Sequence, residues 1–224
     1  MISSEQFLTS VFWAQELPGE EQERARRGIA LRNLDVGASL IHRGDRVDSW
    51  IGVVSGLLKL GSITDSGKAV SYVGLPPSCW FGEGSLLKDE PRQYDVVALR
   101  RTQVALLNRA TFFWLFENSV AFNRLLVRLF NERLGQFIAL VEHDRTLDST
   151  GKVARSLAWL FNPVISPFLG KHIDISQEEI GLLAGVSRPV ANRTLQELER
   201  AGLLRNEGGG VTILDLGKLR RYGE

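Results

Sequence analysis

The sequence predicts an α+β fold: an N-terminal antiparallel β-roll, then a long helix, then a C-terminal winged helix-turn-helix. Three observations predict this fold. Short β-rich runs alternate with glycine turns over residues 31–108. A proline-free segment with apolar residues at spacings of three and four covers residues 110–145. Two helical patterns joined by a three-residue turn cover residues 175–204.

The chain before residue 31 indicates helices, and the region after it indicates strands. An amphipathic helix is expected around the apolar residues Phe7, Leu8, Val11 and Phe12, and a polar helix after Pro18. In the β-rich region, Ser66-Gly67 predicts a hairpin turn. Short, closely spaced strands favour a jelly-roll barrel. The five candidate strands are SWIGVVSG, LLKLGSI, AVSYVGL, YDVVAL and TQVALL.

The long helix carries two apolar stripes. We call the first the seam, and its members are Val127, Phe130, Leu134, Phe137 and Val141. We call the second the inner stripe, and its members are Phe122, Leu125, Leu126 and Leu129. A helix with two apolar stripes needs two covering surfaces. We expect one stripe to lie on the sheet and the other to face a partner helix in a coiled-coil homodimer, although a core helix of a single domain is the alternative.

A hinge at residues 147–152 leads into the last part of the chain. Ser149 or Thr150 is a candidate N-cap for the helix that follows. Ser176 and Glu179 then form a capping-box pattern, and Gly185 is suited to end that helix. Ser187 is the expected N-cap of the next helix. These signals predict two short helices with a tight turn between them.

The second of these helices has a polar and an apolar side. At 100° per residue the apolar side gathers Val190, Ala191, Thr194, Leu198 and Ala201. The polar side and its leading edge define what we call the reading face: Ser187, Arg188, Pro189, Asn192, Arg193 and Gln196. Arginine can bind guanine with two hydrogen bonds, and Asn or Gln can bind adenine in the same way. Arg205, in the expected wing, is placed for a phosphate contact.

The charge of the chain limits this interpretation. The net charge is +1, and residues 148–224 contain ten Lys and Arg residues and nine Asp and Glu residues. The reading face must therefore be positive locally, with Glu197 and Glu199 turned away from DNA, and an ordinary solvated helix face is the alternative.

With a single cysteine, Cys79, an intrachain disulfide is excluded, and we expect a cytoplasmic protein without signal peptide or membrane span.

Residues 175–204, ISQEEIGLLAGVSRPVANRTLQELERAGLL, resemble the helix-turn-helix of the CRP/FNR (catabolite activator protein) family of bacterial transcription regulators. Residues 34–60 resemble the first half of that family's cyclic-nucleotide-binding β-roll, and residues 147–160 its hinge and the first helix of its C-terminal domain. Residues 80–99, WFGEGSLLKDEPRQYDVVAL, resemble its phosphate-binding cassette, and we call them the cassette. The resemblance covers nearly the whole chain in the family's order. It implies residues 1–116 as N-terminal helices and effector-type roll, 117–146 as dimerisation helix and 147–224 as DNA-binding domain.

In the reading face, Ser187, Arg188 and Arg193 match the family's frequent pattern, which implies guanine or phosphate contacts. Pro189 stands where the family has a glutamate, and proline cannot accept a hydrogen bond from cytosine. We therefore expect an operator that differs at one base from the family's best-known one. Double-stranded DNA is the expected partner, with RNA polymerase as a second partner if the protein activates transcription.

In the cassette, Gly82, Glu83 and Arg92 match the family, which implies effector contacts from the carboxylate and the guanidinium. Gln93 and Tyr94 depart from it. On the long helix, Phe137 and Ile138 replace the polar pair that reaches adenine in cyclic-AMP-binding members. These four positions complete the candidate effector site and disfavour cyclic AMP. The alternative is that Glu83 and Arg92 pair within the roll or hold it against the helix.

Three other functions are weaker alternatives. A jelly roll also suits a metal-dependent cupin enzyme or sensor, but His42, His143 and His172 lie in separate segments, so we expect neither a metal site nor catalysis. Cys79 is a candidate for sensing, although a lone cysteine beside aromatics is more often buried and inert. The tryptophans fill the core or line a site for an aromatic effector. The preferred function is a DNA-binding regulator that responds to an unidentified effector, and the cofactor is unknown. The runner-up is a regulator that needs no effector because Tyr94 and Phe137 fill its pocket.

Overall fold

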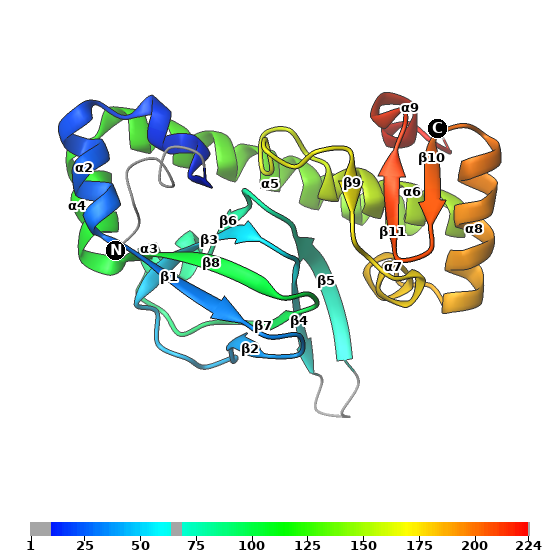
Figure 1. The fold of residues 1–224 in the computed structure, drawn as a ribbon, viewed down its shortest axis with the longest axis horizontal. Helices are drawn as coiled ribbons and strands as arrows, with labels where there is room; N and C mark the ends of the chain where they lie inside the picture. Colours follow the sequence, from blue (N-terminus) through cyan, green and yellow to red (C-terminus); the bar gives the residue numbers. More distant parts are fainter. Residues whose placement is uncertain (1–9, 64–68, 224) are drawn as a thin grey trace.

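The computed structural model describes residues 10–63 and 69–223. A β-roll lies beside a smaller C-terminal domain, and one long helix runs along the roll and continues to that domain (Figure 1). The predicted α+β architecture is therefore confirmed. In the described ranges no helix is long and apolar enough to cross a membrane.

The roll consists of two antiparallel four-stranded sheets, which enclose an apolar core that includes Ile51, Val53 and Val96. All five predicted strands are present, and three further strands join them. The first sheet is β1 (Ile29–Leu34), β8 (Thr102–Asn108), β3 (Ser49–Ser55) and β6 (Trp80–Phe81). The second is β2 (Ser39–Ile41), β7 (Asp95–Ala98), β4 (Leu58–Ile63) and β5 (Ala69–Leu75).

The predicted hairpin joins β4 and β5, which pair antiparallel with Ile63 opposite Ala69. The Ser66-Gly67 turn itself lies outside the described residues, as does most of the amphipathic helix expected around Phe7. What the structure describes there is a 3₁₀ turn, η1 (Phe12–Glu16). The polar helix after Pro18 is confirmed as α2 (Gly19–Arg27).

A second apolar core joins the N-terminal helices, the roll and the long helix. Trp13, Trp50 and Trp80 meet there with ring centroids 4.6 to 5.5 Å apart, against Phe112 and Phe122. These three tryptophans therefore fill the core, as expected by default. Phe112 belongs to α4 (Arg109–Asn118), which lies beside α2 at one end of the roll (Figure 1).

The long helix is α5 (Val120–Thr146), and its two stripes differ in burial. All four residues of the inner stripe are buried in the core that contains the tryptophans. All five residues of the seam are exposed, with Val127 at 66% and Leu134 at 58%. One stripe is thus covered within the chain, and the other is left uncovered in the single chain.

The hinge leads into α6 (Ser149–Leu160), and its N-cap is Asp148. The prediction that Ser149 or Thr150 caps this helix is wrong. Asp148 Oδ1 accepts the Gly151 N–H at 2.8 Å. A carboxylate one residue earlier satisfies the open backbone donor, so the hydroxyl residues begin the helix proper.

The C-terminal domain contains α6, α7 (Gln177–Ala184), α8 (Arg188–Arg200) and α9 (Leu216–Arg220). A three-stranded antiparallel sheet completes it, in the order β10 (Leu204–Glu207), β11 (Gly210–Ile213) and β9 (His172–Ile173). The predicted hairpin wing is β10 and β11, and β9 is a strand that the sequence pattern did not predict.

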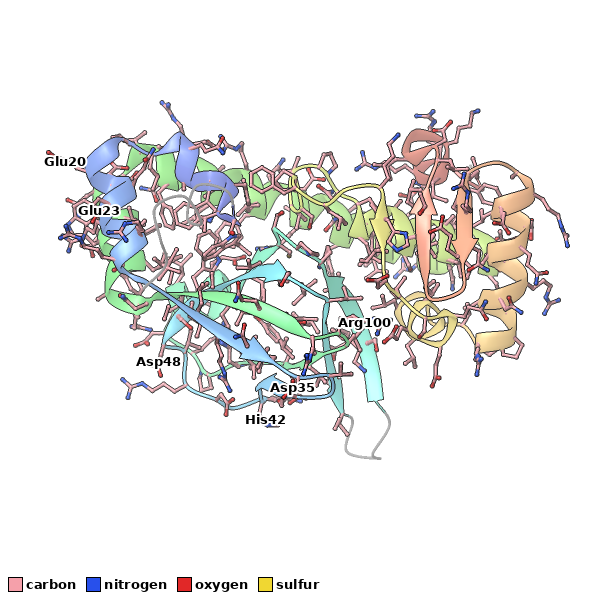
Figure 2. The ribbon with its side chains drawn as sticks, viewed as in Figure 1. Glu20, Glu23, Asp35, His42, Asp48 and Arg100 are labelled. Atoms are coloured by element: carbon pink, nitrogen blue, oxygen red, sulfur yellow. The ribbon has the colours of Figure 1, made fainter. Side chains whose placement is uncertain are left out.

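The C-terminal domain lies directly on its own roll. Leu57 of the roll is buried in the apolar cluster of the C-terminal domain. At Gly74 of β5 a Cβ atom would lie 2.6 Å from Leu160 Cδ2, so the backbone of β5 approaches α6 closely. Arg100 donates to both carboxylate oxygens of Glu179 of α7, each at 2.8 Å. Arg100 lies on the side of the roll that faces this domain (Figure 2).

Candidate nucleic-acid interface and effector cassette

The first helix of the candidate DNA-binding motif begins with the predicted capping box. Ser176 Oγ accepts the Glu179 N–H at 3.2 Å, and Glu179 Oε2 accepts the Ser176 N–H at 2.7 Å. Gly185 ends the helix with φ of 69°, a left-handed conformation that costs glycine little. A Cβ at Gly181 would lie 2.8 Å from the Val186 carbonyl oxygen, so this glycine sets the tight packing of the turn.

The second helix, α8, presents the reading face to solvent. Ser187, Arg188, Pro189, Arg193 and Gln196 are exposed, and Asn192 is half-buried. Its opposite side is buried in the domain core through Ala191, Thr194, Leu195 and Leu198. Ala201, which the helical spacing places on the buried side, is instead exposed. This difference arises because α8 ends at Arg200, and Gly202 follows with φ of 71°.

The acidic residues of α8 are engaged away from the reading face. Glu197 accepts hydrogen bonds from Thr150 and from the Tyr222 hydroxyl. Glu199 accepts the Asn206 N–H of the wing at 2.9 Å. Both acids thus contact the domain's own hinge, C-terminal segment and wing. The reading face therefore contains two arginines, Arg188 and Arg193, and no acidic residue.

In the wing, Arg205 of β10 is exposed and lies 3.6 Å from Glu207. Strand β11 pairs with both β10 and β9, which makes the wing a sheet of three strands rather than an isolated hairpin. Arg205 therefore projects from a supported strand, on the same domain as the reading face.

The cassette begins with Gly82, whose φ of 92° allows α3 (Glu83–Lys88) to start directly after β6. Arg92 is 3% exposed and donates to the carbonyl oxygens of Gly82 at 3.0 Å and Ser49 at 2.7 Å. A Cβ at Gly82 would collide with the Arg92 guanidinium, so glycine is required by this approach as well. Both terminal nitrogens of Arg92 thus already bind the roll's own backbone.

Glu83 is bound from two sides and does not pair with Arg92. Its Oε2 accepts the Trp50 indole N–H at 3.0 Å, and its Oε1 forms an ion pair with Arg133 of α5. Arg133 also donates to the Trp80 carbonyl oxygen. Of the two structural alternatives for Glu83, the contacts match the one in which it holds the roll against the helix.

Arg133 is a site residue that the sequence reasoning missed. It follows Leu129 by four residues, so it continues the inner stripe along the helix. A charged residue in register with a buried stripe requires a buried partner. That signal was available in the sequence, and Glu83 is the partner.

The residues of the candidate effector site do not all line one pocket. Gly82, Glu83, Gln93 and Tyr94 line a pocket of about 340 Å³ together with Arg133. Phe137 lines a different cavity, and Ile138 is 60% exposed on α5. The structure thus brings Gln93 and Tyr94 to the cassette pocket but places Phe137 outside it.

Cys79 and the two histidines whose side chains the structure describes, His42 and His172, lie in different parts of the fold. Cys79 is 3% exposed, and burial raises the pKa of its thiol to about 11. His42 lies near Asp95, whereas His172 contacts Asp174 and Thr212 in another domain. Within the described residues no group of three or more His, Cys, Asp or Glu side chains is placed to hold a metal ion.

The chain resembles known regulators over most of its length. It is 28% identical over 83% of the chain and 84% of the relative to a CRP-like cAMP-activated global transcriptional regulator of Mycobacterium tuberculosis. It is 27% identical, over 88% of the chain and 89% of the relative, to a cyclic AMP receptor protein of Thermus thermophilus. The crystal structure of the Thermus thermophilus catabolite activator protein superposes with a TM-score of 0.52, 25% identity and coverage of 93% of this chain and 98% of that one.

Two family models match the two halves of the molecule. The cyclic nucleotide-binding domain matches residues 31–119, and the Crp-like helix-turn-helix domain matches residues 151–222. A roll of this type joined by a long helix to an exposed reading face defines a DNA-binding transcription regulator. The chain belongs to the CRP/FNR family of such regulators.

Proposed function

We propose that this regulator is a homodimer that places one α8 helix in each of two successive major grooves of a two-fold symmetric operator. The observation that carries the proposal is the combination of an exposed reading face with an exposed seam on one chain. In helix-turn-helix dimers the two recognition helices bind half-sites one helical turn apart, so a spacer between them is required. Helix α5, with 27 residues, is that spacer.

The seam supports a second copy of the chain as the partner. Its five apolar residues lie on one face of α5 at heptad-like spacing and are all exposed in the single chain. A continuous apolar stripe of this kind is costly to leave in water. Pairing of two seams around a two-fold axis covers both stripes at once and relates the two reading faces by the same symmetry.

Within the reading face, we assign base contacts to Arg188, Asn192, Arg193 and Gln196. Ser187 lies at the N-terminus of α8, where its hydroxyl and the free backbone N–H groups suit a phosphate. Pro189 follows it at the second helical position and contributes an apolar contact only. Arg205 of the wing is assigned to a phosphate, because it is exposed on the same domain.

The decisive experiment selects operator DNA with the full-length protein from a pool of duplexes with a random core. We expect enrichment of a two-fold symmetric sequence whose binding weakens steeply with salt. Arg193→Ala is expected to weaken binding to the selected duplex by about 1–3 kcal/mol and to relax specificity at one position per half-site. Arg43→Ala, an exposed arginine of the roll, is the control. An asymmetric selected sequence, or an unchanged footprint with Arg193→Ala, contradicts the proposal.

We further infer that the cassette serves as a structural joint and does not hold cyclic AMP. Both carboxylate oxygens of Glu83 and both terminal nitrogens of Arg92 have partners within the chain. A nucleotide has to break these contacts to bind, and each lost hydrogen bond costs about 1–3 kcal/mol when a buried group is left unpaired. Calorimetric titration with cyclic AMP is expected to give no binding at millimolar nucleotide. Micromolar binding contradicts this inference.

The proposal includes a cytoplasmic location, where a transcription regulator meets its DNA, and a contact with RNA polymerase if the protein activates transcription. It includes no catalytic role, in line with relatives that are transcription regulators. The cupin-like alternative is supported by no contact that we describe. A regulator that responds to no cyclic nucleotide remains compatible with an effector that binds elsewhere on the chain.

A further inference from the structure

The largest cavity that we describe lies where three parts of the molecule meet. It has a volume of about 600 Å³ and is bounded by β5 of the roll, by α5 and by the C-terminal domain. Val73 and Leu75 line it from the roll, Leu140 from the long helix, and Ile165 and Leu183 from the C-terminal domain. This volume falls within the range of about 300–1,000 Å³ that is usual for sites of small organic ligands.

The lining of the cavity is mainly apolar and carries no free charge. Arg133 is its only charged side chain among the described residues, and Glu83 and the Trp80 carbonyl oxygen already bind it. An anion such as a nucleotide phosphate finds no unpaired cation there. The cavity therefore favours a neutral ligand.

One buried polar group in the lining is left without a partner. Ser166 is 3% exposed, and its hydroxyl has no hydrogen bond within the described part of the chain. Buried hydroxyl groups are nearly always hydrogen-bonded, so a buried orphan at a cavity wall indicates a missing partner. A ligand with one donor or acceptor at the right place supplies it.

The cavity also reaches the DNA-binding motif. Ala184 and Gly185 line it, and these residues end α7 and begin the turn that leads to the reading face. Ser187, the N-cap of α8, follows only two residues later. A molecule in the cavity thus contacts the roll, the long helix and the turn of the helix-turn-helix at the same time.

We propose that this cavity is a binding site for a neutral, largely apolar small molecule with a single hydrogen-bonding group, and that its occupant sets the position of the DNA-binding domain on the roll. The binding part stands on the cavity alone, whereas the effect on DNA rests on the proposed function. A ligand shifts the domain only if it binds one position better than another. The cassette pocket adjoins this cavity through Val73, Leu75 and Arg133, but it is lined by Glu83, which the cavity is not.

The test uses two fluorescent probes of nearly the same shape. N-phenyl-1-naphthylamine is neutral, and 8-anilinonaphthalene-1-sulfonate carries a sulfonate. Each is titrated into the full-length protein, with equilibrium dialysis for the stoichiometry. We expect one neutral probe per chain, bound at least about tenfold more tightly than the anionic probe and not displaced by cyclic AMP. Absence of saturable binding, or equal binding of the anionic probe, overturns the proposal.

Two neighbouring residues of α5 provide a matched pair of variants. Leu140 and Val141 are each 41% exposed, but only Leu140 lines the cavity. Leu140→Trp is expected to fill the cavity and to weaken binding of the neutral probe at least about tenfold. Val141→Trp, which belongs to the seam, is expected to leave it within about twofold. Equal loss in both variants assigns the probe to the seam and overturns the cavity site.

The role of the orphaned hydroxyl is tested by Ser166→Ala. Removal of an unpartnered buried hydroxyl does not weaken the fold, so folded protein is expected. The variant should bind the neutral probe, whose amine can hydrogen-bond to Ser166, about three- to tenfold more weakly. Unchanged or tighter binding overturns the assignment of Ser166.

The regulatory part is measured on the selected operator duplex. Addition of saturating neutral probe is expected to change operator affinity at least about threefold for the original protein, but not for Leu140→Trp. Probe binding without any change in operator affinity overturns the regulatory part. Failure of operator selection without probe contradicts the proposed function instead, so the two failures are distinguishable.

Discussion

Arg100 of the roll and Glu179 of α7 form a two-pronged ion pair, with Nη1 and Nη2 each 2.8 Å from a carboxylate oxygen. Oε2 of Glu179 also accepts the Ser176 N–H. A single carboxylate therefore fixes the start of α7 and joins the DNA-binding domain to the roll. Arg100 lies in the loop between β7 and β8, 79 residues away in sequence.

This pair predicts a stability that depends on pH. Burial opposes ionisation of Glu179, but hydrogen bonds from Arg100 and Ser176 outweigh it and lower the pKa of the carboxyl below its ordinary 4.5. Because the folded pKa lies below the unfolded one, the stabilisation is complete above about pH 4.5 and is lost as the pH falls through the folded value. Arg100→Ala is expected to lower the free energy of unfolding by about 1–2 kcal/mol at pH 7, and by less near pH 3, in urea titrations.

The adjacent Arg101 provides the control for this experiment. Its side chain is 88% exposed and lies 3.5 Å from an equally exposed Asp35. Exposed ion pairs contribute little, so Arg101→Ala should change the free energy of unfolding by less than about 0.5 kcal/mol at either pH. An Arg100→Ala effect that is independent of pH contradicts the assignment to Glu179.

Truncation of Arg133 should be costly because it strands the buried carboxylate of Glu83. Arg133→Met is expected to lower the free energy of unfolding by about 2–4 kcal/mol, measured by denaturant titration. Addition of Glu83→Gln should recover part of this loss, since the stranded charge is then removed. Arg128→Met is the control on the same helix, because Arg128 pairs with the half-exposed Glu16, and less than about 1 kcal/mol is expected. Equal losses for Arg133→Met and Arg128→Met are the contrary result.

The seam predicts how the chain assembles. Leu134→Glu places a charge on the proposed helix–helix contact, where burial of an unpaired carboxylate is unfavourable. The variant is expected to be monomeric in light scattering at concentrations at which the original protein is dimeric, and to lose binding to the symmetric operator. Val36→Glu, at an equally exposed apolar position of the roll, should remain dimeric. A dimer that persists with Leu134→Glu would assign the contact to another surface.

Cys79 should be unreactive in the folded protein. Burial raises its pKa to about 11 from an ordinary 9, which leaves about a hundredfold less thiolate near pH 8. Reaction with iodoacetamide at pH 8 is therefore expected to be at least about a hundredfold slower in the native than in the unfolded chain. Rapid native labelling would restore the sensing alternative.

Sequence periodicity and turn chemistry predicted most of the fold. The five predicted strands, the capping box at Ser176 and the end of α7 at Gly185 are confirmed because short-range rules govern them. The two stripes of α5 also differ in burial, as their spacing implied: the inner stripe is buried, and the seam is exposed. Asp148 as N-cap was missed because three adjacent residues of the hinge are all good capping residues.

The candidate site was only partly predictable, because its partners come from distant segments. Glu83 and Arg92 were singled out, yet the partner of Glu83 is Arg133, fifty positions further along the chain. Phe137 was expected at the cassette and instead lines the cavity between domains. The roles of the reading face and of the cassette remain predictions that await the experiments above.

Gly74 of β5 lets the C-terminal domain pack closely on the roll. Because β5 has no side chain there, α6 approaches its backbone so closely that a single added methyl group would meet Leu160 at 2.6 Å. Any larger residue must therefore displace the Leu160 side chain or move α6 away from β5. A substitution at this one position can thus change how the C-terminal domain packs on the roll, while every residue of the reading face stays the same.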